Sequence, residues 1–289
     1  MQSSDWQAIR CLVSVPASRP ALIAKAMATN ADAVLIDLED AVAPGDKDTA
    51  RLALADIAGA KPTVVRVNAA RTPWCHQDVL ACAMPGGPDA IMLPKVEQSG
   101  DLEFLDRLLS GAEAASDRTT PLTVLALIES ATGLANVREI ARASNRTGAL
   151  VLGYADLGAS LGRSANLGAS RWLYAQEAML TAARSAGLAA IDGPHLGVAV
   201  DDEFLAGVEH SVALGFDGKW VIHPRQIDTV TAAFTPSAAA VDEAQAIIDA
   251  LTAAHESHRG AVTVGGRMID EALAVSARRL LARAHYGRA

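Results

Sequence analysis

Short apolar runs recur along most of the chain, and segments with helical spacing separate nearly all of them. The runs are rich in Val, Ile, Leu and Ala and show little alternation with polar residues, which is typical of strands buried on both faces of a parallel sheet. Eight such strands are expected, at residues 11–15, 33–38, 63–68, 90–95, 124–128, 149–153, 188–191 and 219–222.

Strands that alternate with helices indicate an α/β fold with a parallel sheet. Eight of them, with no change of composition between the two halves, favour a (β/α)8 TIM barrel, and we place this domain at residues 1–234. An open doubly wound sheet is the alternative fold. That fold requires a glycine fingerprint after its first strand, whereas the sequence at this point is PASRP.

Residues 235–289 extend beyond the eight expected strands. A long helix is expected from Ser237, followed by a strand-like segment at 261–264, a Gly-Gly turn at 265–266 and a final helix at 271–284. We therefore expect a C-terminal helical extension. Such an extension packs either on its own subunit or on a neighbouring one, and the sequence leaves both arrangements open.

Polar residues lie at or just beyond the carboxyl ends of all eight expected strands. They are Ser14, Asp37, Arg66, Lys95, Glu129, Asp156, Asp192 and His223. In a (β/α)8 barrel this end of the strands is the face on which active sites are built. The pattern therefore predicts an active site at this face, although Asp192 and His223 could also simply close their strands.

Two of these acids follow neighbouring expected strands. Glu129 ends the strand at 124–128, and Asp156 follows the strand at 149–153. If a crossover helix joins two adjacent parallel strands, both carboxylates emerge at the same edge, which suits a hard divalent cation such as Mg2+. A single acid at a strand end more often caps the following helix. The pairing of two acids favours metal binding instead.

Charge and cysteine content narrow the classes of function. The formal net charge of −8, with 33 acidic and 25 basic residues and no dense basic run, argues against a nucleic-acid surface. Three cysteines without CxxC spacing argue against a disulfide framework or a zinc site and indicate a reducing cytoplasmic location. No leader-like start and no apolar stretch of about 18 residues are present, so we expect no membrane partner.

Several motifs occur in an order that resembles a known family. They are VLIDLEDAVAPGDKDTAR, VVRVN, IMLPKVE, ALIES, GYADLGASLG, GFDGKWVIHPRQI, AAFTPS and GRMID. The set resembles the citrate lyase beta subunit and its relatives, the malyl-CoA and citramalyl-CoA lyases, within the HpcH/HpaI aldolase superfamily. The resemblance implies a (β/α)8 barrel with a C-terminal extension. It also implies Mg2+-dependent cleavage of a 3-hydroxyacyl thioester into an acyl thioester and a 2-oxo acid.

The resemblance assigns expected roles to four residues. Glu129 and Asp156 match the metal ligands, and Arg66 matches an arginine that stabilises the enolate oxygen of the thioester product. Asp270 of the GRMID motif matches an acid–base aspartate that the extension delivers, in lyases of this type, from a neighbouring subunit. We accordingly expect a homo-oligomer, taken as a homotrimer. As alternatives, Arg66 could form a purely structural ion pair, and Asp270 could cap the final helix.

Other residues are expected around this centre. The acids Asp37, Glu39 and Asp40 are candidates for holding waters around the metal, and Lys95 either pairs with one of them or contacts substrate. Backbone amides after Gly153, including that of Ala155, could bind the carboxylate of the oxo acid. The complete set expected to support the metal or the substrate is Asp37, Glu39, Asp40, Lys95, Ala155 and Asp192.

The thioester carrier and the oxo acid stay open at this point. Departures from the family pattern include Ala17 in the first loop, Ala155 in place of a common acid, and Ala272 in place of a common proline. The first hypothesis is a stand-alone lyase that acts on malyl-CoA or citramalyl-CoA and releases pyruvate, glyoxylate or oxaloacetate. The alternatives are the citryl-acyl carrier protein lyase subunit of a citrate lyase complex, or a thioester-binding subunit without catalysis.

Overall fold

The computed structural model describes residues 3–57, 59, 61–163, 168–256, 261–264 and 267–286. The chain forms two compact units, Met1–Ala232 and Ala233–Ala289. Within the described ranges, no helix is both long enough and apolar enough to cross a membrane.

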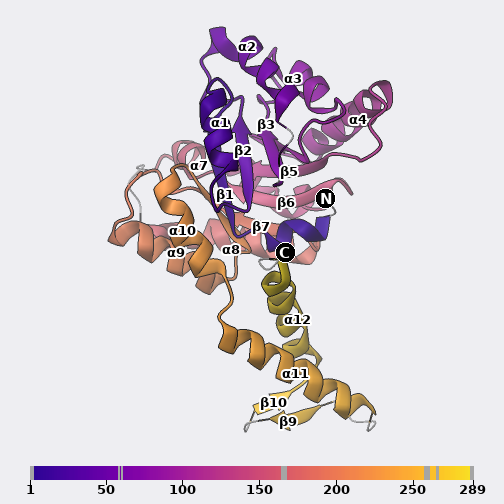
Figure 1. Ribbon diagram of the computed structural model, residues 1–289, viewed down its shortest axis with the longest axis vertical. Coiled ribbons are helices and arrows are strands. Elements are labelled where there is room, and N and C mark those ends of the chain that lie inside the picture. The colour runs from indigo at the N-terminus through magenta and orange to yellow at the C-terminus, as the bar shows by residue number, and fades with distance from the viewer. Residues whose placement is uncertain are drawn as a thin grey trace. The chain divides into compact units, whose positions relative to one another are not determined.

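The first unit is a closed barrel of eight parallel strands (Figure 1). The strands are β1 (Cys11–Pro16), β2 (Ala33–Asp37), β3 (Thr63–Arg66), β4 (Ala90–Leu93), β5 (Thr123–Ile128), β6 (Thr147–Leu152), β7 (Ala189–Asp192) and β8 (Gly218–Val221). Each strand pairs with the next, and β8 pairs with β1 to close the sheet. The predicted (β/α)8 fold is therefore confirmed, with strand ends within two residues of those expected.

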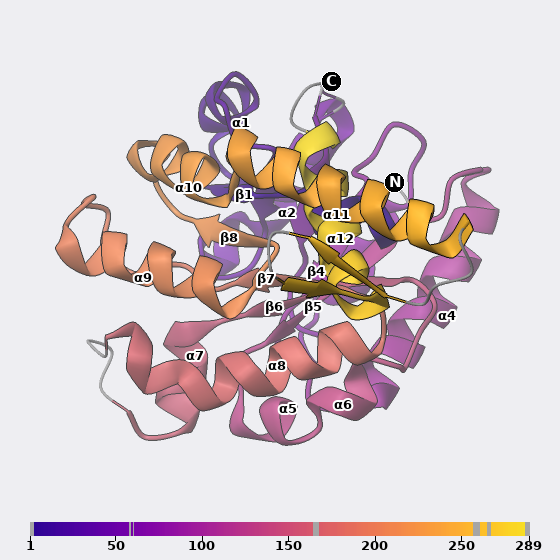
Figure 2. The same ribbon diagram turned by 90° about the horizontal axis from the view of Figure 1, so that it is seen from below.

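Helices surround the strands, as Figure 2 shows for α4, α7, α8, α9 and α10. The helices of this unit are α1 (Pro20–Met27), α2 (Lys47–Leu52), α3 (Cys75–Cys82), α4 (Ser99–Ala115), α5 (Ala131–Ala135), α6 (Val137–Ile140), α7 (Tyr154–Ser160), α8 (Leu173–Ser185), α9 (Asp202–Leu214) and α10 (Ile227–Phe234). The crossover between β5 and β6 consists of two short helices, since α5 ends at Ala135 and Asn136 separates it from α6.

Alternate strand positions fill the inside of the barrel. The apolar cluster there includes Leu35 of β2, Val64 of β3, Leu127 of β5 and Trp220 of β8. Side chains two positions apart on a strand point to the same face. Asp37, Arg66 and Glu129 come two positions after Leu35, Val64 and Leu127. Their side chains therefore also point to the inside of the barrel, at its carboxyl end.

The second unit has its own small core. The helices α11 (Ala238–Glu256) and α12 (Glu271–Tyr286) pack together, and an antiparallel pair, β9 (Val262–Val264) and β10 (Arg267–Ile269), lies between them in sequence. One cluster of buried residues in this unit consists of Leu251, Ile269 and Ala274. Ser237 accepts a hydrogen bond from the amide of Ala240 at 3.2 Å, as expected for the start of α11. The glycines 265–266, expected as a turn, lie outside the described residues.

Candidate active site

A buried ion pair joins the ends of β2 and β3. Nε of Arg66 donates to Oδ1 of Asp37 at 2.8 Å, and Nη2 donates to Oδ2 at 2.5 Å. The carboxylate of Asp37 also accepts the backbone amides of Glu39 and Ala41. Burial opposes the charge of Arg66, but the hydrogen bond and the charge of Asp37 outweigh it and raise the pKa of the guanidinium. Arg66 is thus a fixed cation at the barrel mouth.

Glu39 links Arg66 to Lys95. Its Oε2 lies 3.1 Å from Nη1 of Arg66, and its Oε1 accepts from Nζ of Lys95 at 2.5 Å. The contact with Arg66 lacks the angles of a hydrogen bond, so in the described part of the chain the buried Oε2 has no hydrogen-bond partner. Burial raises the pKa of Glu39. Asp40 is largely exposed and lies farther out, with Oδ2 3.9 Å from Nη1 of Arg66.

Glu129 is held at the end of β5 with only 4% of its surface exposed. Its Oε1 accepts from the amide of Lys95 at 2.8 Å, and Lys95 adopts a positive φ of 53° to present that amide. Few non-glycine residues adopt this conformation, which costs backbone energy. The backbone after β4 is therefore shaped around the carboxylate of Glu129.

Negative charge is in excess at this point. Burial, together with the charges of Glu39 and Asp156, raises the pKa of Glu129 to about 8 against the opposing effects of Arg66 and Lys95. The Lys95 ammonium lies between Oε1 of Glu39 and Oδ2 of Asp156, which is 3.4 Å away. Asp156 lies in the first turn of α7 and is partly exposed.

The donor set fits Mg2+. Glu129 and Asp156 offer carboxylate oxygens, and a dication would favour the ionised form of Glu129, whose pKa is raised by burial and by the neighbouring acids. Among the described residues, no group of three or more His, Cys, Asp and Glu side chains could hold a metal ion by itself. Two carboxylates, Glu129 and Asp156, would leave the remaining positions to water and substrate, which is how Mg2+ is usually bound in enzymes.

Two cavities adjoin this cluster. One of about 380 Å³ is lined by Glu129, Asp156 and Lys95, with Arg71 and Ser130 among its other walls. Another of about 980 Å³ is formed by the loop after β1 and by the segment after β2 that begins at Ala41. The first cavity therefore gives room for a small acid beside Glu129 and Asp156, whereas the second is lined by residues outside the cluster.

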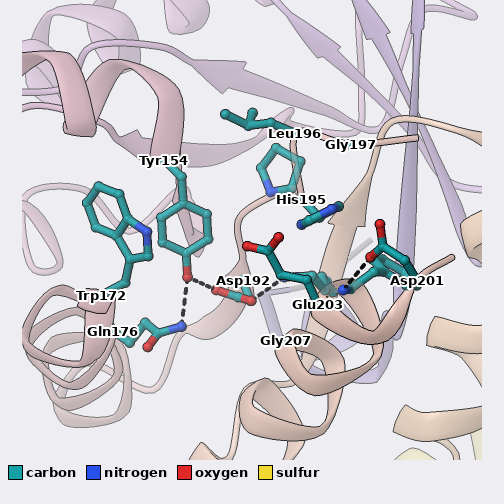
Figure 3. A pocket seen from close by; sticks show the side chains of 13 residues that line it. Tyr154, Trp172, Gln176, Asp192, His195, Leu196, Gly197, Asp201, Glu203 and Gly207 are labelled. Carbon is teal, nitrogen blue, oxygen red and sulfur yellow. Dashed lines mark hydrogen bonds and ion pairs between the residues drawn. The ribbon is translucent and has the colours of Figure 1, made fainter. Parts of the chain in front are cut away.

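Asp192 does not join this cluster. It follows Ile191, which points into the barrel, so its own side chain points outward to the helices. There it forms an ion pair with Lys219 and accepts hydrogen bonds from Tyr154 and Ser211 beside a cavity of about 390 Å³ (Figure 3).

The remaining expected residues have separate positions. Nδ1 of His223 accepts the amide of Arg225 at 3.2 Å and so caps a short 3-10 turn. Ala155 is the second residue of α7. Asp270 belongs to the second unit, where its Oδ1 accepts the amide of Leu273 at 3.2 Å. This bond is the cap considered as an alternative for Asp270.

Sequence reasoning missed three side chains, one beside Arg66 and two around Asp192. Trp220 of β8 is buried, and its ring centroid lies 5.3 Å from Cζ of Arg66, a cation–π distance. Tyr154 and Lys219 form the network around Asp192. A signal existed for Lys219, because a lysine within a short apolar run requires a partner.

Comparisons with known proteins identify the family of the chain. A family profile described as HpcH/HpaI aldolase/citrate lyase matches residues 10–224. The L-malyl-CoA/beta-methylmalyl-CoA lyase of Cereibacter sphaeroides (strain ATCC 17025 / ATH 2.4.3) is 39% identical over 285 residues, covering 90% of each chain. The citrate lyase subunit beta of Leuconostoc mesenteroides subsp. cremoris is 34% identical and covers 94% of this chain and 92% of its own.

A solved structure extends the similarity to the fold of nearly the whole chain. The protein CitE from Mycobacterium tuberculosis, in complex with magnesium, acetoacetate and coenzyme A, is 34% identical with a TM-score of 0.75. The match covers 96% of this chain and 99% of that one. From the eight-stranded barrel, the profile and these relatives it follows that the chain belongs to the HpcH/HpaI aldolase/citrate lyase family.

Proposed function

We propose that the protein is a Mg2+-dependent carbon–carbon lyase that cleaves a 3-hydroxyacyl-CoA thioester of the malyl-CoA or citramalyl-CoA type. The observation that carries the proposal is the excess of carboxylates around Glu129 next to the fixed cation Arg66 at the barrel mouth. The named activity of the Cereibacter sphaeroides relative supports the substrate class, and CitE, crystallised with magnesium and coenzyme A, supports the metal and the carrier.

Glu129 and Asp156 would hold the metal. When bound, Mg2+ supplies a Lewis acid that polarises the oxygen destined to become the ketone. Glu39 and Asp40 would hold waters around the metal, and Asp37 would support them. Lys95, which now balances Glu39 and Asp156, is free to turn toward the carboxylate of the oxo acid, and we assign the backbone of Ala155 to the same carboxylate.

Arg66 would stabilise the second product. Cleavage places negative charge on the thioester oxygen as an enolate forms, and a fixed donor there lowers the barrier. Two Arg66 nitrogens are committed to Asp37, and Nη1 lies on the side of Glu39 and Asp40. The ring of Trp220 supports the guanidinium face. This arrangement leaves Nη1 as the nitrogen for substrate.

Asp270 would move the protons. In cleavage, a base takes the proton of the 3-hydroxyl, the carbon–carbon bond breaks, and the enolate carbon receives a proton to give the acyl thioester. We assign this exchange to Asp270, supplied by a neighbouring copy within a homotrimer. Its exposure is intermediate and one carboxylate oxygen accepts a helix amide, which leaves the second for proton transfer.

The cavity of about 980 Å³ beside the Asp37 loop is our proposed place for the carrier of the thioester.

The three cysteines, Cys11, Cys75 and Cys82, are free and buried, and we propose a cytoplasmic location on that basis. The similarity to a citrate lyase subunit beta supports a second candidate, action on a citryl thioester of an acyl carrier protein.

A thioester screen tests the proposal. Malyl-CoA, citramalyl-CoA, citryl-CoA and citryl-acyl carrier protein would each be incubated with the protein and Mg2+, and release of glyoxylate, pyruvate or oxaloacetate would be measured. We expect turnover with malyl-CoA or citramalyl-CoA that stops with a chelator. Turnover with the carrier-protein substrate alone would favour the second candidate. Mg2+ binding without turnover of any thioester would favour a non-catalytic subunit.

A further inference from the structure

We propose that Tyr154 is a positioning residue that fixes the helical turn carrying Asp156, through a buried polar network centred on Asp192. The inference deepens the proposed function and rests on it, because it concerns the metal ligand Asp156. This role gives a reason for the buried charged network around Asp192, whose side chains contact neither Arg66 nor Glu129.

Asp192 is surrounded by donors from three elements. Its Oδ1 accepts the hydroxyl of Tyr154, and its Oδ2 accepts the hydroxyl of Ser211 on α9 at 2.5 Å and the ammonium of Lys219 on β8. Asp192 and Lys219 are 1% and 4% exposed. Lys219 is further fixed by the carbonyl of Gly193 at 2.7 Å. A buried carboxylate with this many donors is rigid.

The hydroxyl of Tyr154 is fixed from a second side. Nε2 of Gln176 on α8 donates to it at 2.8 Å, and Oε1 of Gln176 lies 3.1 Å from Nε2 of His210 on α9. The phenol oxygen therefore donates to Asp192 and accepts from Gln176, which defines its position in two directions. Figure 3 shows this pair of contacts at the hydroxyl.

Packing holds the ring of Tyr154 at two places, because it also lies so close to Gly193 that a β-carbon there would be 2.8 Å from Cδ2 of the ring. The ring of Trp172 contacts Tyr154 on one side with a centroid distance of 5.1 Å, but a cavity of about 390 Å³ lies beside it. In Figure 3 the ring stands at the edge of this cavity. The two hydrogen bonds of the hydroxyl add to this packing and fix the end of the side chain that borders the cavity.

The position of Tyr154 determines that of Asp156. Tyr154 is the first residue of α7 and Asp156 the third. At 3.6 residues per turn their side chains point about 200° apart, so the network grips one side of a turn whose other side presents Asp156 toward Lys95. Gly153, directly before Tyr154, packs against Glu129. A tether at Tyr154 thus steadies both expected metal ligands.

Tyr154→Phe removes the hydroxyl and keeps the ring, and Mg2+ binding to the variant can be measured by titration calorimetry. Loss of a group that orients a ligand typically costs 10–100-fold in metal affinity, and we expect the Mg2+ Kd to rise by about that factor. Tyr174→Phe on α8 is the matched control, since Tyr174 is 74% exposed, and it should leave the Kd unchanged. A purely structural role would lower the melting temperature without changing the Kd.

A second variant, Gln176→Leu, keeps the phenol but removes its donor, together with the contact between Gln176 and His210, and should also weaken Mg2+ binding. If wild-type protein binds Mg2+ and both Tyr154→Phe and Gln176→Leu bind it equally well, the inference is overturned while the proposed function stands. If wild-type protein does not bind Mg2+, the metal-dependent function fails, and the positioning role fails with it.

Discussion

Gly153 lies so close to Glu129 that no larger side chain than hydrogen fits at position 153. A β-carbon at position 153 would lie 2.6 Å from Oε2 and 2.7 Å from Cβ of Glu129, closer than side chains approach. Gly153 is on the inner side of the barrel, two positions after Val151, and Glu129 stands in the adjacent column. The glycine therefore makes room for the carboxylate that we assign to the metal.

Gly153→Ala should displace the carboxylate of Glu129 and abolish detectable Mg2+ binding in calorimetry. Gly111→Ala in α4 is the control, because a β-carbon there meets no atom within 4 Å. That control should keep Mg2+ binding and raise the free energy of unfolding by about 0.5–1 kcal/mol. Normal Mg2+ binding by Gly153→Ala would contradict the position assigned to Glu129.

Metal-free protein should lose stability as the pH rises. The environment raises the pKa of Glu129 from 4.5 to about 8, so the folded state holds this proton more tightly than the unfolded chain. Its contribution to the free energy of unfolding is complete below about pH 4.5 and is lost as the pH approaches 8. The raised pKa of Glu39 acts in the same direction. Urea titrations at several pH values measure this slope.

Mg2+ should reverse the effect, because the metal replaces the proton on Glu129. We expect Mg2+ affinity to increase up to about pH 8, because above this pH the carboxyl of Glu129 is ionised even in the absence of the metal. Glu129→Gln should flatten the pH dependence of metal-free stability. If the free energy of unfolding of that variant depends on pH as strongly as in wild type, groups other than Glu129 cause the pH dependence.

Arg66→Lys should reduce kcat with little loss of fold. A lysine cannot grip Asp37 with two nitrogens and still present a third to the substrate, and one missing oxyanion donor costs about 2–4 kcal/mol of barrier. Arg10→Lys is a matched control, since Arg10 binds Asp32 with two nitrogens before β1, at the opposite end of the strands. Equal kcat for Arg66→Lys and wild type would remove Arg66 from the mechanism.

Mixing subunits tests whether Asp270 acts across an interface. Asp270→Ala and Glu129→Ala should each be inactive alone. If Asp270 of one copy serves the metal centre of another, mixed oligomers contain some intact sites, and part of the activity returns. Exchange is verified by differently tagged subunits. No recovery after proven exchange would indicate that Asp270 serves its own subunit or has no catalytic role.

Much of the barrel could be predicted because each strand is a short apolar run that ends in a polar residue. The sequence does not reveal which way that residue points. The strands are buried on both faces, so no alternation distinguishes the inside of the barrel from the helix side. Glu129 and Asp192 both look like acids at strand ends, yet the first points inward and the second toward α9.

Contacts between distant segments were also beyond sequence reasoning. The Tyr154 hydroxyl meets Asp192 and Gln176 only because β7 and α8 lie beside the start of α7. The positive φ of Lys95 likewise depends on where Glu129 lies, since nothing in AIMLPK marks that residue as strained. Local sequence patterns predict the strands and helices. The site, however, depends on how closure of the barrel brings the ends of the strands together.

Calorimetric titration with Mg2+ tests the central claim most directly, using wild type, Glu129→Ala, Asp156→Ala and the network variant Asp192→Asn. We predict one Mg2+ bound by wild type, no detectable binding by Glu129→Ala or Asp156→Ala, and weakened but measurable binding by Asp192→Asn. Full Mg2+ affinity in either Glu129→Ala or Asp156→Ala would contradict the claim that these two carboxylates hold the metal.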